Sequence, residues 1–422
     1  MALTNTQTVA VQLEYVRPAV PTLFERADTT FSMIERRPVE MVSTRTARIP
    51  LAVSPGGNSG AANLDGGDLG RGSSDEYDFG QLTPIGMKHA VEITKLVEYA
   101  SNSNEKAVAN VTKRAAVNAM KNFRKDVDTW LQTGGNGVMA TINSVAGGPA
   151  NAVYTLANTP FGARLLRKNL TMSLYNAALT VKRGEVTINA NPVRGLGQTQ
   201  TVQVDSDPGA VATDVLLPSG LTGASPVWVY GIPYHHSTST SGTWLNISRS
   251  NDFAVANGVS ASASFSLPPF RLAINQIIQQ LGEEGLSQNL VWHTHPAALA
   301  GYEEYGLSLS RIDRGAGNGD GAKMPAGLFD DKNMTIAGYP CKRSIHADPT
   351  RFDLLNLQSW GRVEWAPIDY LEIGGNTVFP VYGASGGIAA AYLFYFVCGM
   401  QFFVDNPKAI SSVTSVTLPT GY

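Results

Sequence analysis

Two histidines in the stretch NLVWHTHPAALAGYEEYG are the residues of this chain whose spacing most suggests a metal site. His293 and His295 are one residue apart, and Pro296 follows them. Side chains two positions apart on a β-strand lie on the same face, so both imidazoles could bind one zinc ion. A catalytic zinc site needs a third protein ligand, which is not evident in the sequence. The alternative interpretation is two buried strand histidines with ordinary hydrogen-bond partners.

The His-x-His-Pro stretch resembles part of the zinc site of JAMM-type metalloproteases. That site has a Ser eight residues after the second His and an Asp three residues further on. Glu303 and Gly306 occupy those places here. Ser310 and Asp313 have the right separation from each other but lie too far along the chain. A zinc-dependent hydrolase that uses His293 and His295 is therefore kept as an alternative of a different functional class.

Other motifs that could carry chemistry are incomplete. The glycine-rich segment GAGNGDG, residues 315–321, lacks the following Lys-Ser/Thr of a phosphate-binding loop. The chain has no Gly-x-Ser-x-Gly elbow, and Cys341 and Cys398 stand alone. The sequence therefore predicts no enzyme, no cofactor and no bound metal. The two cysteines provide no disulfide framework and favour a reducing compartment.

Composition limits the partners of this 422-residue chain. Its net charge of −2 argues against an autonomous nucleic-acid binder, which would carry a basic excess. The N-terminus has no signal-peptide pattern. The uncharged stretch 387–404 approaches the length of a membrane-spanning helix, but its aromatic residues and interior glycines favour two buried strands or a hairpin arm. We therefore expect no membrane span.

A polar, glycine-rich loop, SPGGNSGAANLDGGDLGRGSSDE, occupies residues 54–76 and is flanked by strand-like segments. It has almost no apolar surface to offset the entropy lost on ordering. The segment 45–86 is expected to form a two-stranded arm, which is not stable alone in water and should lie on another molecule. Its charged residues Asp65, Asp68 and Arg71 are candidates for contacts with a neighbouring subunit.

A long amphipathic helix is predicted over residues 103–133, from a capping-box spacing at Asn102 and Glu105 to a glycine pair that ends it. Its basic face includes Arg114 and Arg124, which are either solvated or turned toward partner subunits. A second helix is predicted over 160–180. Short β segments over 181–266 indicate a separate β module, a helix follows Pro268 and Pro269, and strands dominate from 334 onward.

This order of parts resembles the tailed-phage major capsid proteins of the Hong Kong 97-type fold. RTARIPLAVSPGGNSGAANLDGGDLGRGSSDEYDFGQLTP matches their extended loop, NEKAVANVTKRAAVNAMKNFRKDVDTWLQTGG their spine helix, and FFVDNPKAISSV their closing strand. The resemblance implies an α+β fold and six regions. These are an N-terminal arm (1–44), the extended loop (45–86), a peripheral domain (87–180), a β-rich insertion (181–266), an axial domain (267–370) and a return to the peripheral domain (371–422).

The resemblance also implies a structural role. Such subunits assemble into hexamers and pentamers of an icosahedral phage head that encloses double-stranded DNA without reading its sequence. It implies a virion location after assembly in the bacterial cytoplasm, a separate scaffolding protein, a portal and a decoration protein. The nearest alternative is an encapsulin-type nanocompartment shell. Residues 45–86 contain no lysine, so covalent crosslinking through this loop is not expected.

Overall fold

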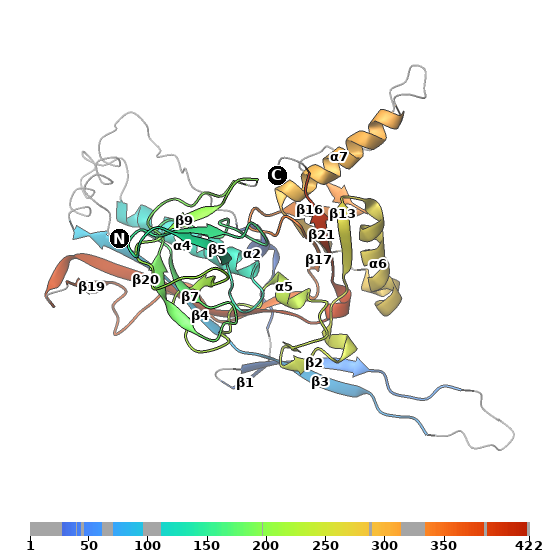
Figure 1. Cartoon of the computed structure of the whole chain (residues 1–422). Coiled ribbons are helices and arrows are strands. Elements are labelled where there is room, and N and C mark those ends of the chain that lie inside the picture. The colour runs from blue at the N-terminus through green and yellow to red at the C-terminus, as the bar shows by residue number, and fades with distance from the viewer. Residues whose placement is uncertain are drawn as a thin grey trace.

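The structure is a computed structural model, and it describes most of the chain. The described residues are 28–38, 40–43, 46–60, 71–95, 111–195, 197–286, 289–313, 334–383 and 386–419. Two sheet-based bodies, a projecting arm and a projecting helix make up this part of the molecule (Figure 1).

The first body is built on one very long strand, β20 (Ile388–Val404). Antiparallel partners line both of its sides: β4 (Ile85–Thr94) on one, and β18 (Trp360–Tyr370) and β19 (Phe379–Tyr382) on the other. The uncharged stretch 387–404 is therefore one continuous strand, where the sequence suggested two strands or a hairpin arm. Among the described helices, none is long and apolar enough to cross a membrane.

Helix α4 (Val111–Leu131) packs on this sheet together with the short helix α2 (Thr29–Met33). The expected long helix is confirmed over these residues, while its first part, with Asn102 and Glu105, lies outside the described residues. The apolar face of α4 is buried: Phe123 and Val127 are fully inaccessible to solvent. Burial of this face, rather than helix propensity alone, stabilises a helix of this kind.

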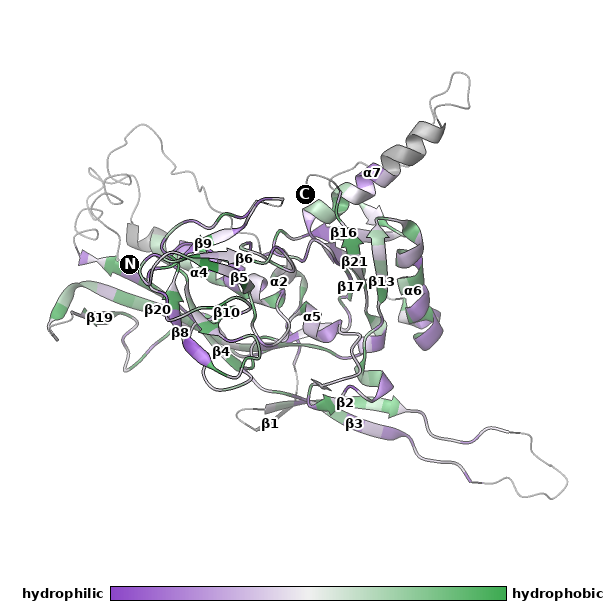
Figure 2. Cartoon of the chain, viewed as in Figure 1, coloured by the Kyte–Doolittle hydropathy of each residue, from purple (hydrophilic) through white to green (hydrophobic). Residues whose placement is uncertain are grey.

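A six-stranded antiparallel sheet shares the core of this body, with the strand order β8-β7-β10-β5-β6-β9. Its strands are β5 (Ala140–Ala146), β6 (Val153–Leu156), β7 (Thr171–Tyr175), β8 (Lys182–Thr187), β9 (Thr201–Gln203) and β10 (Val215–Pro218). The helix predicted over 160–180 is wrong, because turns over 158–165 lead into β7 there. The edge strand β8 is hydrophilic (Figure 2), as suits a strand with one unpaired side.

The β module expected over 181–266 is not a separate unit. Its strands β8, β9 and β10 pair with β5, β6 and β7, which precede them in the chain. Trp228 packs edge-on against Trp130 of α4 with ring centroids 5.2 Å apart. Residues 226–231, within the range expected to hold short β segments, form no such strand and lead into the short helix α5 (Ile232–His235). The alternating pattern indicated strands correctly but carried no information about which strands they would join.

Shortening Leu216 tests this shared sheet. Leu216 is fully buried in β10, the strand between β7 and β5. We expect Leu216→Ala to lower the free energy of unfolding by about 2–5 kcal/mol, because it removes buried methyl groups and leaves a cavity. Chemical denaturation of the dissociated subunit measures this. A loss below about 0.5 kcal/mol, the range of surface substitutions, would contradict the shared core.

The second body is a sheet of order β13-β21-β17-β14-β16-β15. Its strands are β13 (Val259–Ser264), β14 (Leu290–Thr294), β15 (Thr335–Ile336), β16 (Tyr339–Arg343), β17 (Phe352–Asn356) and β21 (Ser411–Thr417). Helix α6 (Leu267–Leu281) confirms the helix predicted after Pro268, and Gly282 ends it with a φ of 70°. Phe270 of α6 packs against Trp292 and Phe352 in the core of this body. Helix α7 (Pro296–Asp313) extends away from it (Figure 1).

Two of the expected domain boundaries differ from the sheets. Strand β18, assigned to the axial domain by the 267–370 boundary, pairs with β20 in the first body. Strand β21, assigned to the 371–422 return segment, pairs with β17 and β13 in the second body. The chain crosses between the two bodies at the turn that contains the 3-10 helix Pro407–Ala409. Both differences arise from long-range strand pairing, which local sequence patterns do not specify.

Candidate assembly surfaces

The most prominent surface is the arm that projects from the body (Figure 1). It is a three-stranded sheet of β1 (Glu40–Ser43), β2 (Thr46–Ser54) and β3 (Glu76–Leu82). Strands β2 and β3 pair antiparallel from Ala47↔Leu82 out to Ser54↔Glu76. The antiparallel hairpin expected over residues 45–86 is therefore present in the described residues, but β1 adds a third strand to it and residues from Ile85 onward belong to β4 of the first body.

The base of the arm is held by a short hairpin, β11 (Thr243–Trp244) and β12 (Ile247–Ser248). Ala47, Ile49 and Leu82 of the arm share a core with Trp244 and Leu245. The Gln81 amide donates a hydrogen bond to the Leu245 carbonyl over 2.9 Å. A Cβ on Gly80 would lie 3.0 Å from the Leu245 side chain, so glycine permits this close approach. The base is thus fixed to the body.

Beyond its base, the arm carries aromatic side chains that the subunit does not cover. Tyr77 is 72% exposed and Phe79 is 47% exposed, and they lie two positions apart on β3. Arg48 lies over the Phe79 ring at 4.4 Å from its centroid. Exposed aromatic residues beside Arg are typical of protein interfaces. The alternation in DEYDFG was the sequence signal for this face, and it was missed.

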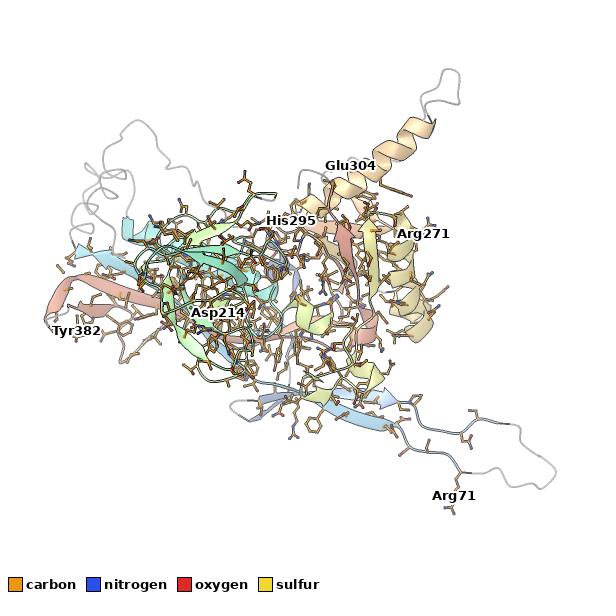
Figure 3. The ribbon with its side chains drawn as sticks, in the orientation of Figure 1. Arg71, Asp214, Arg271, His295, Glu304 and Tyr382 are labelled. Atoms are coloured by element: carbon orange, nitrogen blue, oxygen red, sulfur yellow. The ribbon has the colours of Figure 1, made fainter. Side chains whose placement is uncertain are left out.

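The two segments that continue β2 and β3 stay hydrogen-bonded to each other beyond the last strand pair. The Gly56 amide donates to Asp75 Oδ1 over 2.6 Å, and the Gly57 amide donates to the Ser73 carbonyl over 2.8 Å. Of the three charged candidates in this loop, Asp65 and Asp68 lie outside the described residues. Arg71 is exposed far from the body (Figure 3), where a neighbouring molecule could reach it.

The candidates on α4 have a different setting. The side chain of Arg114 lies outside the described part of the helix. Arg124 forms an ion pair with Asp28 at 2.9 Å and lies over the Phe31 ring at 5.6 Å. This residue therefore holds α2 and its preceding residue against α4 within the same subunit. A contact of Arg124 with a neighbour remains a prediction.

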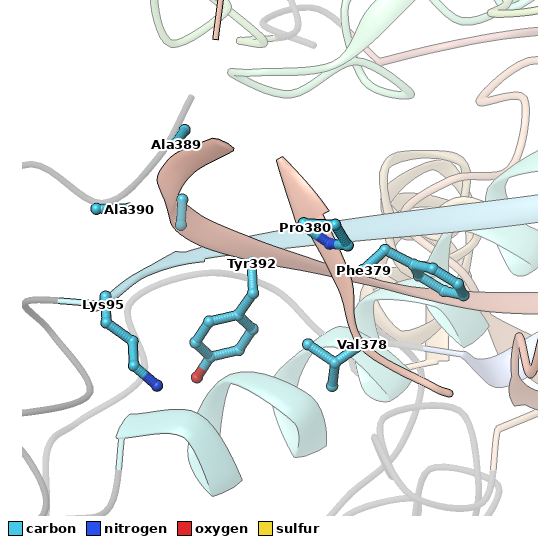
Figure 4. Close-up of a pocket in the computed structure, with 8 residues that line it drawn as sticks. Lys95, Val378, Phe379, Pro380, Ala389, Ala390 and Tyr392 are labelled. Atoms are coloured by element: carbon cyan, nitrogen blue, oxygen red, sulfur yellow. The ribbon is translucent and has the colours of Figure 1, made fainter. Parts of the chain in front are cut away.

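An apolar tip at the far end of the long sheet is a second uncovered surface. Tyr382 and Ile388 flank the turn between β19 and β20 and are 67% and 72% exposed. Val378 and Ile373, in the segment that precedes β19, are also exposed, and Figure 3 shows Tyr382 at the end of the molecule opposite Arg71. An open groove of about 550 Å³ lies beside this tip. It is lined by Lys95, Val378, Phe379, Pro380, Ala389, Ala390, Ala391 and Tyr392 (Figure 4).

The tip has the composition of an interaction site rather than of a solvated strand end. Clustered exposed apolar residues mark association surfaces. Sequence reasoning missed this tip because it treated 387–404 as buried throughout. The available signal was the glycine-rich GASGG beside Ile388, which marks the sheet end where burial stops.

The candidate zinc residues occupy buried, hydrogen-bonded positions. His293 Nε2 lies 3.0 Å from Thr30 Oγ1, and His295 Nδ1 accepts the Ala297 amide over 3.0 Å. Each ring thus has one nitrogen engaged by a protein group. Within the described residues, no three His, Cys, Asp or Glu side chains gather so that they could hold a metal ion.

A metal analysis separates the two interpretations of His293 and His295. We expect purified protein, incubated with zinc and then desalted, to retain far less than one zinc per chain, because no third ligand lies beside these rings in the part of the chain that the structure describes. The double variant His293→Ala plus His295→Ala is expected to retain the same trace amount. One zinc per wild-type chain that disappears in the double variant would instead support the hydrolase.

Comparisons with known proteins show which fold this architecture belongs to. A scan against protein-family models finds no match, and a search of curated proteins finds none. Among solved structures, the capsid asymmetric unit of cyanophage A-1(L) aligns over 98% of this chain and 100% of its own, with a TM-score of 0.53 and 12% identity. The chain has the Hong Kong 97-type capsid fold.

Two further solved structures align over nearly the whole capsid-fold chain. The mature capsid of bacteriophage PhiM1 gives a TM-score of 0.46 at 12% identity, covering 97% of this chain and 93% of its own. The holo-SrpI encapsulin complex of Synechococcus elongatus PCC 7942 gives a TM-score of 0.46 at 9% identity, covering 100% of both chains.

Proposed function

We propose that this chain is the major capsid protein of a tailed phage, a subunit that associates with copies of itself into a closed icosahedral shell. The observation that carries the proposal is the β2–β3 arm, which extends beyond the subunit and exposes Tyr77 and Phe79. Beyond Arg48 the arm is a two-stranded hairpin, which is marginal alone in water, so a covering partner would stabilise it. A second copy of the chain supplies such a partner at every position of a shell.

The proposed mechanism is association rather than catalysis. Each subunit offers two surfaces of different kinds, the arm and the apolar tip, at opposite ends of the molecule. Contacts between unlike surfaces on successive copies close into rings when the rotation permits, here hexamers and pentamers. The net charge of −2 suits a wall around double-stranded DNA, because a strongly basic wall would hold the phosphates and oppose DNA movement. A separate scaffolding protein, a portal and a decoration protein are the partners we expect.

Expression of the chain tests this proposal. We expect the purified protein to sediment in part as large closed particles, with or without a coexpressed scaffolding protein, and to show shells by negative-stain electron microscopy. Treatment of particles purified from infected cells with a nuclease separates the phage shell from an encapsulin. Protected double-stranded DNA inside supports the phage shell, whereas a protein cargo without DNA contradicts it. A chain that stays monomeric under all these conditions contradicts any shell.

A further inference from the structure

A layer of buried histidines lies where the two bodies of the subunit meet. The chain has six histidines, and five of them are almost fully buried in this layer: His235, His236, His293, His295 and His346. Trp360 of β18 stacks on His236 at 6.0 Å and meets His235 edge-on at 5.1 Å. His293 and its neighbour Trp292 belong to β14 of the second body. Figure 3 shows His295 between the two bodies.

Two of these rings are bonded in a way that only a neutral imidazole satisfies. His235 Nδ1 accepts a hydrogen bond from Trp244 Nε1 over 3.1 Å, while Nε2 faces the Phe402 carbonyl at 3.3 Å. His295 Nδ1 accepts the backbone amide of Ala297, in the first turn of α7. A proton on either Nδ1 would place one N–H against another. Both hydrogen bonds would then be lost.

The other rings join the two bodies through backbone and carboxylate groups. His346 Nδ1 lies 3.1 Å from Asp128 Oδ2 of α4, and the Phe31 amide donates to Asp128 Oδ1 over 2.8 Å. His236 Nδ1 donates to the Ser411 carbonyl over 3.0 Å. The charged groups that act on these rings are Asp128, Asp353, Arg164, Arg249 and Arg351, and Asp348 interacts in turn with Arg164 and Arg351.

Burial disfavours the protonated, charged form of the histidines in this layer. It lowers the pKa of His235 to about 3 and the pKa of His295 to about 4, and nearby Arg164 adds to the lowering at His295. The pKa values of His236 and His293 are also lowered by burial. An exposed histidine has a pKa of about 6.5. Below that pH an opened layer therefore binds protons that the closed layer does not, and the closed state loses stability as the pH falls.

We infer that the histidine layer is an acid-sensitive seam between the two bodies, closed at neutral pH and opened when protons bind to it. Opening separates α2 and α4 from β14 and from the turn around His346, and it leaves the sheet of each body intact. For each histidine that is protonated only in the open state, the opening equilibrium rises by about 30-fold between pH 7.5 and 5.0.

Hydrogen exchange of the full-length dissociated subunit tests the seam at these two pH values, after correction for the intrinsic pH dependence of exchange. The reporter amides are Phe31, Ala297 and Ser344, which bond across or beside the layer. We expect their protection to fall by at least 30-fold at pH 5.0 relative to amides in β7 and β10. Equal losses in the reporters and in β7 and β10 would indicate global acid unfolding and would overturn the seam.

The variant His295→Asn separates the titrating ring from its structural bond. Asn caps helices well, and its Oδ1 can keep the bond to the Ala297 amide without titrating. We expect its pH response to be about 30-fold smaller than that of the wild type. The matched control is His89→Asn, which removes the one histidine outside the layer, paired with Asp126 at 3.5 Å. An unchanged response in His295→Asn, or an equal reduction in His89→Asn, would overturn the inference.

A second variant covers the case in which His295→Asn does not fold. His236→Asn keeps a donor toward the Ser411 carbonyl and removes a different ring of the layer, one whose pKa is lowered by burial. It is expected to reduce the pH response of the same reporter amides. If neither variant folds, an unchanged protection of the wild-type reporters between pH 7.5 and 5.0 would still overturn the seam.

Discussion

A subunit in which Asn-Gly replaces residues 55–75 will fold normally and will not close into shells. Ser54 and Glu76 are the last paired residues of the arm, so a two-residue turn can join β2 to β3 directly. The removed residues carry little apolar surface, so we expect the free energy of unfolding of the dissociated subunit to change by no more than about 1 kcal/mol. Every subunit of a shell would lose the contact made by this loop, so the yield of closed particles should fall at least tenfold by sedimentation.

A companion variant keeps the length of the loop but removes its charged side chains. In it a Gly/Ser segment of equal length replaces residues 55–75, which removes Asp65, Asp68 and Arg71 together. We expect it to assemble poorly too, since a neighbour would recognise these side chains. Normal shells from the Asn-Gly subunit would rule out an intersubunit role of the loop. A large loss of stability would show that the loop packs within its own subunit.

We expect negative charge at the apolar tip to block assembly as strongly as replacement of the loop does. Tyr382→Asp plus Ile388→Asp places two carboxylates at positions whose side chains are mostly exposed in the isolated subunit. Substitutions at such positions change stability by about 0.5 kcal/mol or less. If a second copy covers the tip, both carboxylates are desolvated on association, and an unpaired buried charge is very unfavourable. Closed particles should therefore be absent by electron microscopy.

The matched control for the tip places the same charges elsewhere. Val181→Asp plus Val193→Asp changes two exposed valines beside β8 and β9, strands of a different sheet from β19 and β20. We expect this variant to form shells. Shells from the tip variant in wild-type yield would show that the tip faces solvent in the assembled particle.

Local patterns predicted the elements of this fold better than their partners. The apolar stripe of α6, with Gly282 at its end, and the paired strands around the glycine-rich loop were read correctly because their signals lie within a few residues of each other. The distribution of residues 181–266 over several sheets was not predicted. Strands β8, β10 and β13 pair with strands that precede or follow this range in the chain. Strand β7 was mistaken for a helix for the same reason, since its burial comes from β8 and β10.

The assembly surfaces were predicted in part. The composition of residues 54–76 revealed the arm, because a segment with nothing to bury needs outside support. The aromatic pair Tyr77 and Phe79 and the tip at Ile388 escaped notice, because exposure depends on where the body of the molecule ends. The histidine layer was equally hidden. Its five rings come from α5, β14 and two separate turns, which only the fold brings together.

The position of the arm in an assembled particle tests the central claim most directly. A cryo-electron microscopy map of particles formed by the full-length chain would show each arm and its surroundings at side-chain detail. We expect Tyr77, Phe79 and the loop 55–75 of every subunit to lie on a neighbouring copy within closed rings of five and six. Arms that fold back on their own subunit, or a chain that forms no closed particle at all, would contradict the account.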